Sequence, residues 1–296
     1  TICVPEELNL GTDGTCTEPS RQSARELPKF DVAVRTEKGT RKYMEDTYSA
    51  KAMAGCKLYG VFDGHGGDKA SKYCSTHLLS NVIKQLRLQP EDVPGALQCG
   101  FMETEERFLN EARSHNWNDG TTALVLCICC DHLHVAHSGD SRIVLVRQVD
   151  QEGQCEVLTK DHRPTNKKEI AMILKRGGKV KDEKDGIPRV YPGACAFTRS
   201  IGDLDAKPVL NPEPEIRSLP IDKQMHSLVL ATDGLWDVLS NDLCAQICCM
   251  ANDAKRAADR LVDAALFLGS QDNITVMVIT FRQPEVKSSS ARRSHH

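Results

Sequence analysis

Segments with the pattern of strands come in groups in this sequence, and segments with the pattern of helices come in pairs. The predicted strands are residues 31–35, 47–54, 57–62, 121–130, 133–137, 142–147, 227–232 and 273–281. The predicted helices are residues 70–82, 97–112, 241–250 and 253–268, and a fifth with Pro164 just inside its start and Gly177 at its end. Strict alternation of strand and helix is typical of a parallel sheet, so this order favours antiparallel sheets with helices packed outside them.

The length and charge of the chain exclude several classes of protein. The 296 residues suffice for one large domain or two small ones, and the uniform composition favours one. Lys and Arg number 38 and Asp and Glu 41, so the formal net charge is −3, which does not suit a protein that binds the nucleic-acid backbone. The longest apolar run, residues 121–130, is half of the ~20 residues that a membrane-spanning helix needs. We expect a soluble protein with no nucleic-acid partner and no membrane insertion.

The two ends of the chain differ in composition from the rest. Residues 1–29 are rich in Pro and Gly, and we predict an irregular lead-in there. Residues 284–296 are rich in Ser and Arg and are expected to be a disordered tail or a cloning remnant. The folded domain is predicted to span residues 30–283, with an exposed insert and a long connection in residues 178–220.

The cysteines are expected to be unpaired. Their number, 13, prevents complete internal pairing, and the sequence has no pair of Cys-x-x-Cys motifs that would predict zinc. Six of them fall at the spacing of a strand or a helix: Cys127, Cys129, Cys130, Cys244, Cys248 and Cys249. Since buried thiols behave as small apolar groups, we expect the first three to pack in the core without a disulfide or a metal. This usage predicts a reducing compartment, cytoplasmic or nuclear, and Thr1 as first residue leaves open that a targeting segment was removed.

Acidic residues mark the ends of the predicted strands, beside Gly or another turn-forming residue. They are Glu45, Asp46, Asp63, Asp140, Asp233 and Asp272. If these ends converge, the ionised carboxylates repel one another and require divalent cations, and hard oxygen ligands select Mg²⁺ or Mn²⁺. One Asp can bridge two such ions about 3.5–4 Å apart, which is the spacing of a two-metal hydrolase. The alternative interpretation is that each Asp-Gly pair is an ordinary turn.

Four further positions have both a functional and a structural interpretation. Arg41 could hold a phosphate through two hydrogen bonds, or it could be a surface residue. His65 could donate a proton to a leaving oxygen, or it could cap a turn. Gly64 has no Cβ, which would let its carbonyl reach a cation. Asp203 is either a further acid of the site or a cap.

Eight short motifs occur in the order of one known family, across about residues 30–281. They read RKYMED (41–46), VFDGHGG (61–67), DGTTA (119–123), SGDSR (138–142), TKDHRP (159–164), FTRSIGD (197–203), ATDGLWD (231–237) and QDNIT (271–275). With these motifs the chain resembles the metal-dependent protein serine/threonine phosphatases of type 2C, the PPM family. Each motif is weak alone, and the eight in sequence are specific.

The resemblance implies an α+β fold, a four-layer α-β-β-α sandwich of two packed antiparallel sheets flanked by helix pairs, with the metal centre at one edge. It also implies two Mn²⁺ or Mg²⁺ ions and a third, weaker ion. Asp63 would bridge the two ions, and Asp233 and Asp272 would complete the protein ligands of one of them. The Gly64 carbonyl and Glu45, the latter directly or through water, would bind the other.

The resemblance assigns the remaining roles as well. Asp46 would orient these ligands, and Asp140 would hold the third ion together with Asp233. Arg41 would bind the substrate phosphate, and His65 would protonate the departing Ser or Thr oxygen. Residues 178–193 would form the flap beside the active site, which influences substrate choice.

The implied activity is hydrolysis of phosphoserine and phosphothreonine in proteins by a water activated between two metal ions, without a covalent phosphoenzyme. We expect phosphorylated proteins as partners and a monomeric enzyme. One alternative is an inactive pseudophosphatase that binds phosphoproteins, which would lack ligands, and none of Glu45, Asp63, Asp233 or Asp272 is missing. Another is a two-metal phosphodiesterase or nuclease, against which the 5% aromatic content and the lack of a basic stripe argue.

Overall fold

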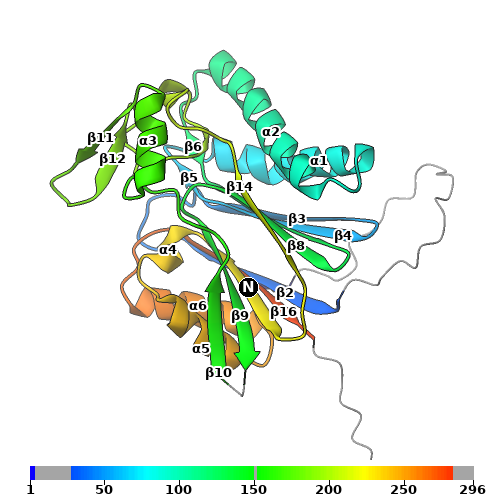
Figure 1. Cartoon of the computed structure of the whole chain (residues 1–296). Helices are drawn as coiled ribbons and strands as arrows, with labels where there is room; N and C mark the ends of the chain where they lie inside the picture. The colour runs from blue at the N-terminus through cyan, green and yellow to red at the C-terminus, as the bar shows by residue number, and fades with distance from the viewer. Residues whose placement is uncertain (4–27, 150–151, 283–296) are drawn as a thin grey trace, which may run out of the picture.

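The computed structural model describes residues 1–3, 28–149 and 152–282. Two antiparallel sheets lie face to face at its centre, and helices cover the outer face of each (Figure 1). This arrangement confirms the predicted α+β, four-layer sandwich. Most of the predicted lead-in, and all of the predicted tail, lie outside the described residues.

The first sheet has six strands in the order β1-β2-β16-β15-β9-β10. In that order their bounds are Ile2–Cys3, Phe30–Glu37, Ile274–Phe281, Met225–Ala231, Arg142–Val149 and Glu152–Val157. The second has five strands in the order β14-β8-β7-β4-β3. Their bounds are Glu215–Pro220, His132–Ser138, Ala123–Cys129, Cys56–Phe62 and Thr47–Met53. β1, β10 and β14 were not predicted from the sequence. β1 has only two residues and lies in the predicted irregular lead-in, and β10 and β14 are edge strands of few apolar residues, so no hydrophobic pattern indicates them.

Helix α1 (Lys69–Leu88) and helix α2 (Val93–His115) cover the five-stranded sheet. The six-stranded sheet is covered by α5 (Asn241–Cys249) and α6 (Ala254–Phe267), with the short α4 (Asp233–Trp236) beside them. The side-chain carboxylate of Asp92 caps α2 by accepting a hydrogen bond from the Gly95 backbone, and Asp253 caps α6 in the same way.

Alternate side chains of the central strands enter different cores. In β4, Tyr59 and Val61 lie between the two sheets, whereas Leu58 and Phe62 face α1 and α2. The same division holds along β7, β9, β15 and β16. Because both faces of these strands are covered, their sequences are apolar at nearly every position.

A third, small sheet joins the segments at one edge of the sandwich. It consists of β5 (Gly64–His65), β6 (Gly120–Thr121) and β13 (Ile201–Gly202), in the order β13-β6-β5. Beside it, β11 (Lys179–Asp182) and β12 (Pro188–Tyr191) form a hairpin that extends from the main body next to helix α3 (Lys167–Lys175). Two-residue strands carry no periodic signal, so sequence analysis does not detect the small sheet.

Two local predictions differ from the structure. Helix α3 begins after its cap Asn166, whose side chain accepts a hydrogen bond from the Lys168 backbone, so Pro164 precedes the helix and is not inside its start. Residues 178–220 are not only an exposed connection, because they also contain β13, the short 3₁₀ helix η1 (Leu204–Ala206) and strand β14.

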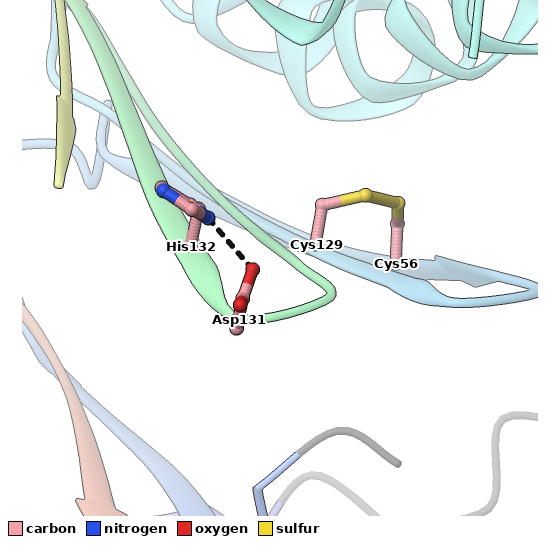
Figure 2. The surroundings of a disulfide bond; sticks show 4 residues. All are labelled: Cys56, Cys129, Asp131 and His132. Carbon is pink, nitrogen blue, oxygen red and sulfur yellow. Dashed lines mark hydrogen bonds and ion pairs between the residues drawn. A yellow bond between two sulfur atoms is a disulfide. The ribbon is translucent and has the colours of Figure 1, made fainter. Parts of the chain in front are cut away.

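The expectation for the cysteines of β7 is wrong in part. Cys127 is buried, but Cys130 is exposed, and Cys129 forms a disulfide with Cys56 (Figure 2). Cys56 and Cys129 are opposite residues of the neighbouring strands β4 and β7, with their α-carbons 4.3 Å apart. Opposite side chains of an antiparallel pair point to the same side of the sheet, so the two thiols meet. The two cysteines are 73 residues apart in sequence, so only the register of the strands reveals that they are partners. The disulfide gives no support to the predicted reducing compartment.

Candidate active site

The acidic strand ends converge on one cavity of about 460 Å³ at one edge of the sandwich. Asp63 follows the last residue of β4, and Asp140 lies in the turn between β8 and β9. Asp233 follows β15 and is the first residue of α4, and Asp272 precedes β16. Together with Glu45, which precedes β3, these four residues line the cavity. The predicted convergence of carboxylates is therefore what the fold produces, because all these strands begin or end at the same edge.

Burial and mutual repulsion raise the pKa values of three of these carboxyl groups, those of Asp63, Asp140 and Asp233. The pKa of Asp63 lies well above its ordinary value because of burial first and then the charges of Asp233 and Asp46. Burial, and then the charge of Asp140, also raise the pKa of Asp233. Burial also raises the pKa of Asp140 to about 6, against the opposing effect of Arg163. Such a group of carboxylates stays ionised at neutral pH only with compensating positive charge nearby.

Asp46 lies behind the cavity wall. Its side chain is buried, and Thr232 Oγ1 donates a hydrogen bond to Oδ2 over 2.9 Å. Among the described residues, Oδ1 has no hydrogen-bond partner, although it is inaccessible to solvent. Burial raises the pKa of Asp46 to about 7. A buried carboxylate oxygen without a donor is costly, so its place beside the cavity favours a bound cation or an ordered water there.

Two arginines supply part of the positive charge. Arg41, on the cavity wall, has Nη2 2.6 Å from Asp272 Oδ2. Arg163 was quoted in a sequence motif without a role, but its Nε lies 3.1 Å from Asp140 Oδ2 and its Nη2 2.7 Å from Asp237 Oδ1. The sequence gives no signal that Arg163 supplies positive charge to these carboxylates, because Arg163 and its partners lie in turns that are far apart in the chain.

Gly64 lies at a position with no room for a side chain. A Cβ there would lie 2.5 Å from the backbone oxygen of Glu45 and 2.8 Å from Ser71 Oγ. Ser71 Oγ donates a hydrogen bond to that same oxygen. The close approach of β5 to the segment before β3 therefore requires Gly at this position.

Asn273 holds the segment that carries Arg41 and Glu45. Its Oδ1 accepts a hydrogen bond from the Glu45 backbone over 2.7 Å, and its Nδ2 donates to the backbone oxygens of Lys38 and Tyr43. Asn273 is buried and lines the cavity. Sequence analysis assigned it no role in the site; its place directly after Asp272 is the only hint.

His65 lies on the cavity wall and contacts Asp203. The Nε2 atom of His65 lies 2.8 Å from Oδ1 and 3.0 Å from Oδ2 of Asp203, and the imidazole ring packs against Phe197 with ring centroids 4.6 Å apart. Ser200 Oγ donates a further hydrogen bond to Asp203 over 2.6 Å. Burial alone would raise the pKa of Asp203, but His65 and Ser200 lower it below its ordinary value. Of the two interpretations of Asp203, the structure therefore favours an acid of the site.

The segment predicted to be a flap borders the cavity. Arg189 of β12 and residues 193–197 line it opposite the acidic strand ends. Arg189 forms an ion pair with Asp185 within the hairpin, with 2.8 Å between Nη2 and Oδ2.

The residues described by the structure contain no group of three or more His, Cys, Asp or Glu side chains already arranged around a metal position. The carboxylates share a cavity, but arginines bind several of them. In the same part of the chain, none of the helices has the length and the apolar character needed to cross a bilayer.

Comparison with known proteins identifies the family. The model of the family "Protein phosphatase 2C" matches residues 30–274. This chain belongs to the protein phosphatase 2C family. The family is one of metal-dependent protein phosphatases of the serine/threonine type.

Curated family members show substantial identity. The "Probable protein phosphatase 2C 76" of Arabidopsis thaliana is 36% identical over 256 residues, which are 85% of this chain and 59% of the relative. The "Probable protein phosphatase 2C 69" of the same plant is 35% identical over 88% of this chain and 73% of the relative. This phosphatase 2C chain thus spans about three-fifths to three-quarters of the length of these two relatives.

Solved structures agree with the sequence relatives. The serine-threonine phosphatase 2C from Toxoplasma gondii superposes with a TM-score of 0.77 at 25% identity, covering 86% of this chain and 97% of that one. A C. elegans sex determining protein superposes with a TM-score of 0.78 at 27% identity, covering 86% of this chain and 65% of that one.

Proposed function

We propose that this phosphatase 2C chain hydrolyses phosphoserine and phosphothreonine in proteins, in a reaction that depends on Mn²⁺ or Mg²⁺. The observation that carries the proposal is the convergence of five acidic side chains, Arg41 and His65 on one cavity. The acidic residues are Glu45, Asp63, Asp140, Asp233 and Asp272. Family membership supports the same activity.

The residues of the cavity fit hard divalent cations. The donors are carboxylate oxygens, which are the ligands that Mg²⁺ and Mn²⁺ prefer. Burial and then the charges of neighbouring carboxylates raise the pKa values of Asp63 and Asp233, and within the described residues a buried oxygen of Asp46 has no hydrogen-bond donor. Bound cations would supply positive charge to these carboxylates and a partner to the Asp46 oxygen.

We assign the ligands as follows. Asp63 would contact two ions, with Asp233 and Asp272 on one side and Glu45 and the Gly64 carbonyl on the other. Asp46 would orient these ligands from behind, and Asp140 with Asp233 would hold a third, weaker ion. When bound, the ions attract the phosphoryl oxygens and lower the pKa of water, so that a nucleophile is available near neutral pH.

The side chains then divide the remaining work. Arg41 would leave Asp272 and bind two phosphoryl oxygens with its planar guanidinium, which fixes the phosphorus in line with the attacking water. The charge that spreads over the phosphoryl oxygens during the reaction is stabilised by the same guanidinium. His65 would donate a proton to the departing Ser or Thr oxygen. The flap residues from 178 to 193 would contact the protein around the phosphorylated residue.

The test is release of phosphate from a phosphoserine peptide by the purified chain with Mn²⁺, compared with EDTA-treated protein and with Asp63→Ala. We expect activity in the first case only. Asp131→Ala, at a half-exposed Asp in the turn between β7 and β8, serves as the matched control and should leave the rate unchanged. Equal turnover in metal-free buffer would overturn the proposal. Peptide binding without any turnover would instead support a pseudophosphatase, and turnover of DNA or RNA alone a nuclease.

A further inference from the structure

The imidazole of His65 is held through one of its two nitrogens. Nε2 donates to the carboxylate of Asp203, whose two oxygens lie 2.8 and 3.0 Å away. Within the described part of the chain, Nδ1 makes no hydrogen bond. Because the ring borders the cavity, Nδ1 is the nitrogen that remains for a bound substrate.

Asp203 is itself fixed by contacts that do not involve His65. Its backbone adopts the left-handed conformation, with φ at 53°, and its backbone N–H donates to the Asp119 oxygen over 3.1 Å. Ser200 Oγ holds its side chain, which is only 8% exposed. The carboxylate therefore cannot turn away from the imidazole without breaking buried hydrogen bonds.

Gly120 makes the contact between the two side chains possible. A Cβ at this position would lie 2.1 Å from Asp203 Oδ2 and 2.5 Å from His65 Nε2. Gly120 does not have a positive φ, so its backbone conformation does not require Gly. The space that the missing side chain leaves is filled by the His65–Asp203 pair, and the small sheet β13-β6-β5 brings all three residues together.

We propose that Asp203 is a positioning residue for the phosphatase reaction, which holds His65 by Nε2 and so directs Nδ1 at the leaving oxygen of the substrate. The inference rests on the proposed function. The bond between phosphorus and the serine oxygen breaks with its electron pair on that oxygen, which takes the proton from Nδ1. The attacking water leaves its hydroxyl on phosphorus, and its second hydrogen returns through solvent to His65.

The physical reason for such a residue is the sensitivity of proton transfer to geometry. A donor must lie within hydrogen-bond reach of the oxygen it protonates, and a misplacement of about 1 Å can cost about 100-fold in rate. An imidazole that is free to rotate about its side-chain bonds would spend little time in that orientation. Alkoxide leaving groups depend on this proton, whereas p-nitrophenolate departs without it.

The kinetic test compares Asp203→Asn with the matched control Asp205→Asn, which makes the same chemical change at an exposed residue two positions away. We expect Asp203→Asn to lower kcat for a phosphoserine peptide by about 10- to 100-fold. Its kcat for p-nitrophenyl phosphate should change by less than about threefold. We expect the same pattern with the two substrates for His65→Gln. Asp205→Asn should match the wild type with both substrates. An equal loss with both substrates, or no loss with either, would overturn the proposal.

A spectroscopic test reads the wild type itself and does not depend on activity. In the Mg²⁺-loaded wild type, long-range ¹⁵N–¹H spectra at pH 8 to 9 report which imidazole nitrogen carries the proton, and His65→Gln identifies the signal. In the neutral imidazole, which carries one proton, we expect that proton on Nε2, facing Asp203. A neutral imidazole with its proton on Nδ1 would overturn the proposal, whereas the imidazolium that protonates the leaving oxygen carries a proton on both nitrogens. Failure of the wild type to hydrolyse any phosphopeptide would overturn the proposed function, while the spectrum would still report the His65–Asp203 contact.

Discussion

Single residues at this site matter because of what they hold in place. Gly64 and Gly120 lie where a Cβ would strike backbone or catalytic atoms. Asn273 fastens the segment of Arg41 and Glu45 through three hydrogen bonds. None of these three residues is charged, yet each determines where charged groups lie. Residues of this kind are hard to recognise from sequence because their function depends on neighbours far away in the chain.

Replacing Asn273 with Ala is expected to impair activity, although the Asn273 side chain has no assigned part in the reaction itself. The change leaves the Glu45 N–H and the Lys38 and Tyr43 carbonyls without their partner, which costs about 1–3 kcal/mol of stability where the groups stay buried. The segment with Arg41 then loses its position, so KM for a phosphopeptide should rise. Urea unfolding and steady-state kinetics measure the two effects, and an unchanged KM would contradict the assigned role of this segment.

Elements around the site are joined by buried ion pairs. Glu169 of α3 accepts hydrogen bonds from Arg199, at 2.6 and 3.0 Å, and from Thr198. Lys207 binds Glu105 of α2 over 2.8 Å, and Glu105 also accepts a hydrogen bond from the Gly202 backbone. These contacts connect α3 and α2 to the segment around β13, which carries Asp203.

Glu169→Gln is expected to destabilise the protein by about 3 kcal/mol at pH 7, because it leaves the buried Arg199 without a countercharge. Burial alone would raise the pKa of Glu169, but Arg199 and Thr198 lower it below 4.5. A carboxylate with a lowered pKa stabilises the fold above its unfolded pKa, and this contribution is lost as the pH falls through the folded value. The difference between variant and wild type in the free energy of unfolding, measured with urea, should therefore become smaller below about pH 4.5. A difference that is constant down to pH 3 would contradict this account.

The whole molecule combines a stable frame with an electrostatically unfavourable edge. Three apolar cores support the two sheets, while the edge that carries the cavity gathers carboxylates whose charges repel. A substitution that removes one of these carboxylates should therefore lower the activity and raise the stability of the metal-free protein.

Asp63→Asn is expected to raise the melting temperature in EDTA while it abolishes phosphatase activity. The substitution removes a carboxyl group whose ionised form is disfavoured by burial first and then by the charges of Asp233 and Asp46. Mn²⁺ should raise the melting temperature of the wild type, because a ligand that binds only the folded state stabilises it, and should raise that of the variant less. Calorimetry with and without Mn²⁺ measures both. A lower melting temperature for Asp63→Asn in EDTA would show that repulsion among the carboxylates is not significant.

Sequence patterns predicted the long apolar strands and helices, since burial of a strand or a helix face leaves a local signal. They did not predict β1, β10, β14, the hairpin of β11 and β12 or the small sheet, where pairing depends on backbone hydrogen bonds and the strands are short or of few apolar residues. The Cys56–Cys129 bond was missed for the same reason, and Arg163 had no assigned role until its partners Asp140 and Asp237 were placed beside it.

The sequence by itself determined the grouped strands and helices, the acidic residues at strand ends and the eight motifs of the family. Only the tertiary structure decided that those ends meet at one edge, that Arg41 and Arg163 bind carboxylates there, and that His65 is paired with Asp203 over Gly120. The physical reason is range. Propensity and periodicity act between neighbours in the chain, whereas electrostatic repulsion, steric exclusion and hydrogen-bond pairing act between whatever residues folding brings within a few ångströms.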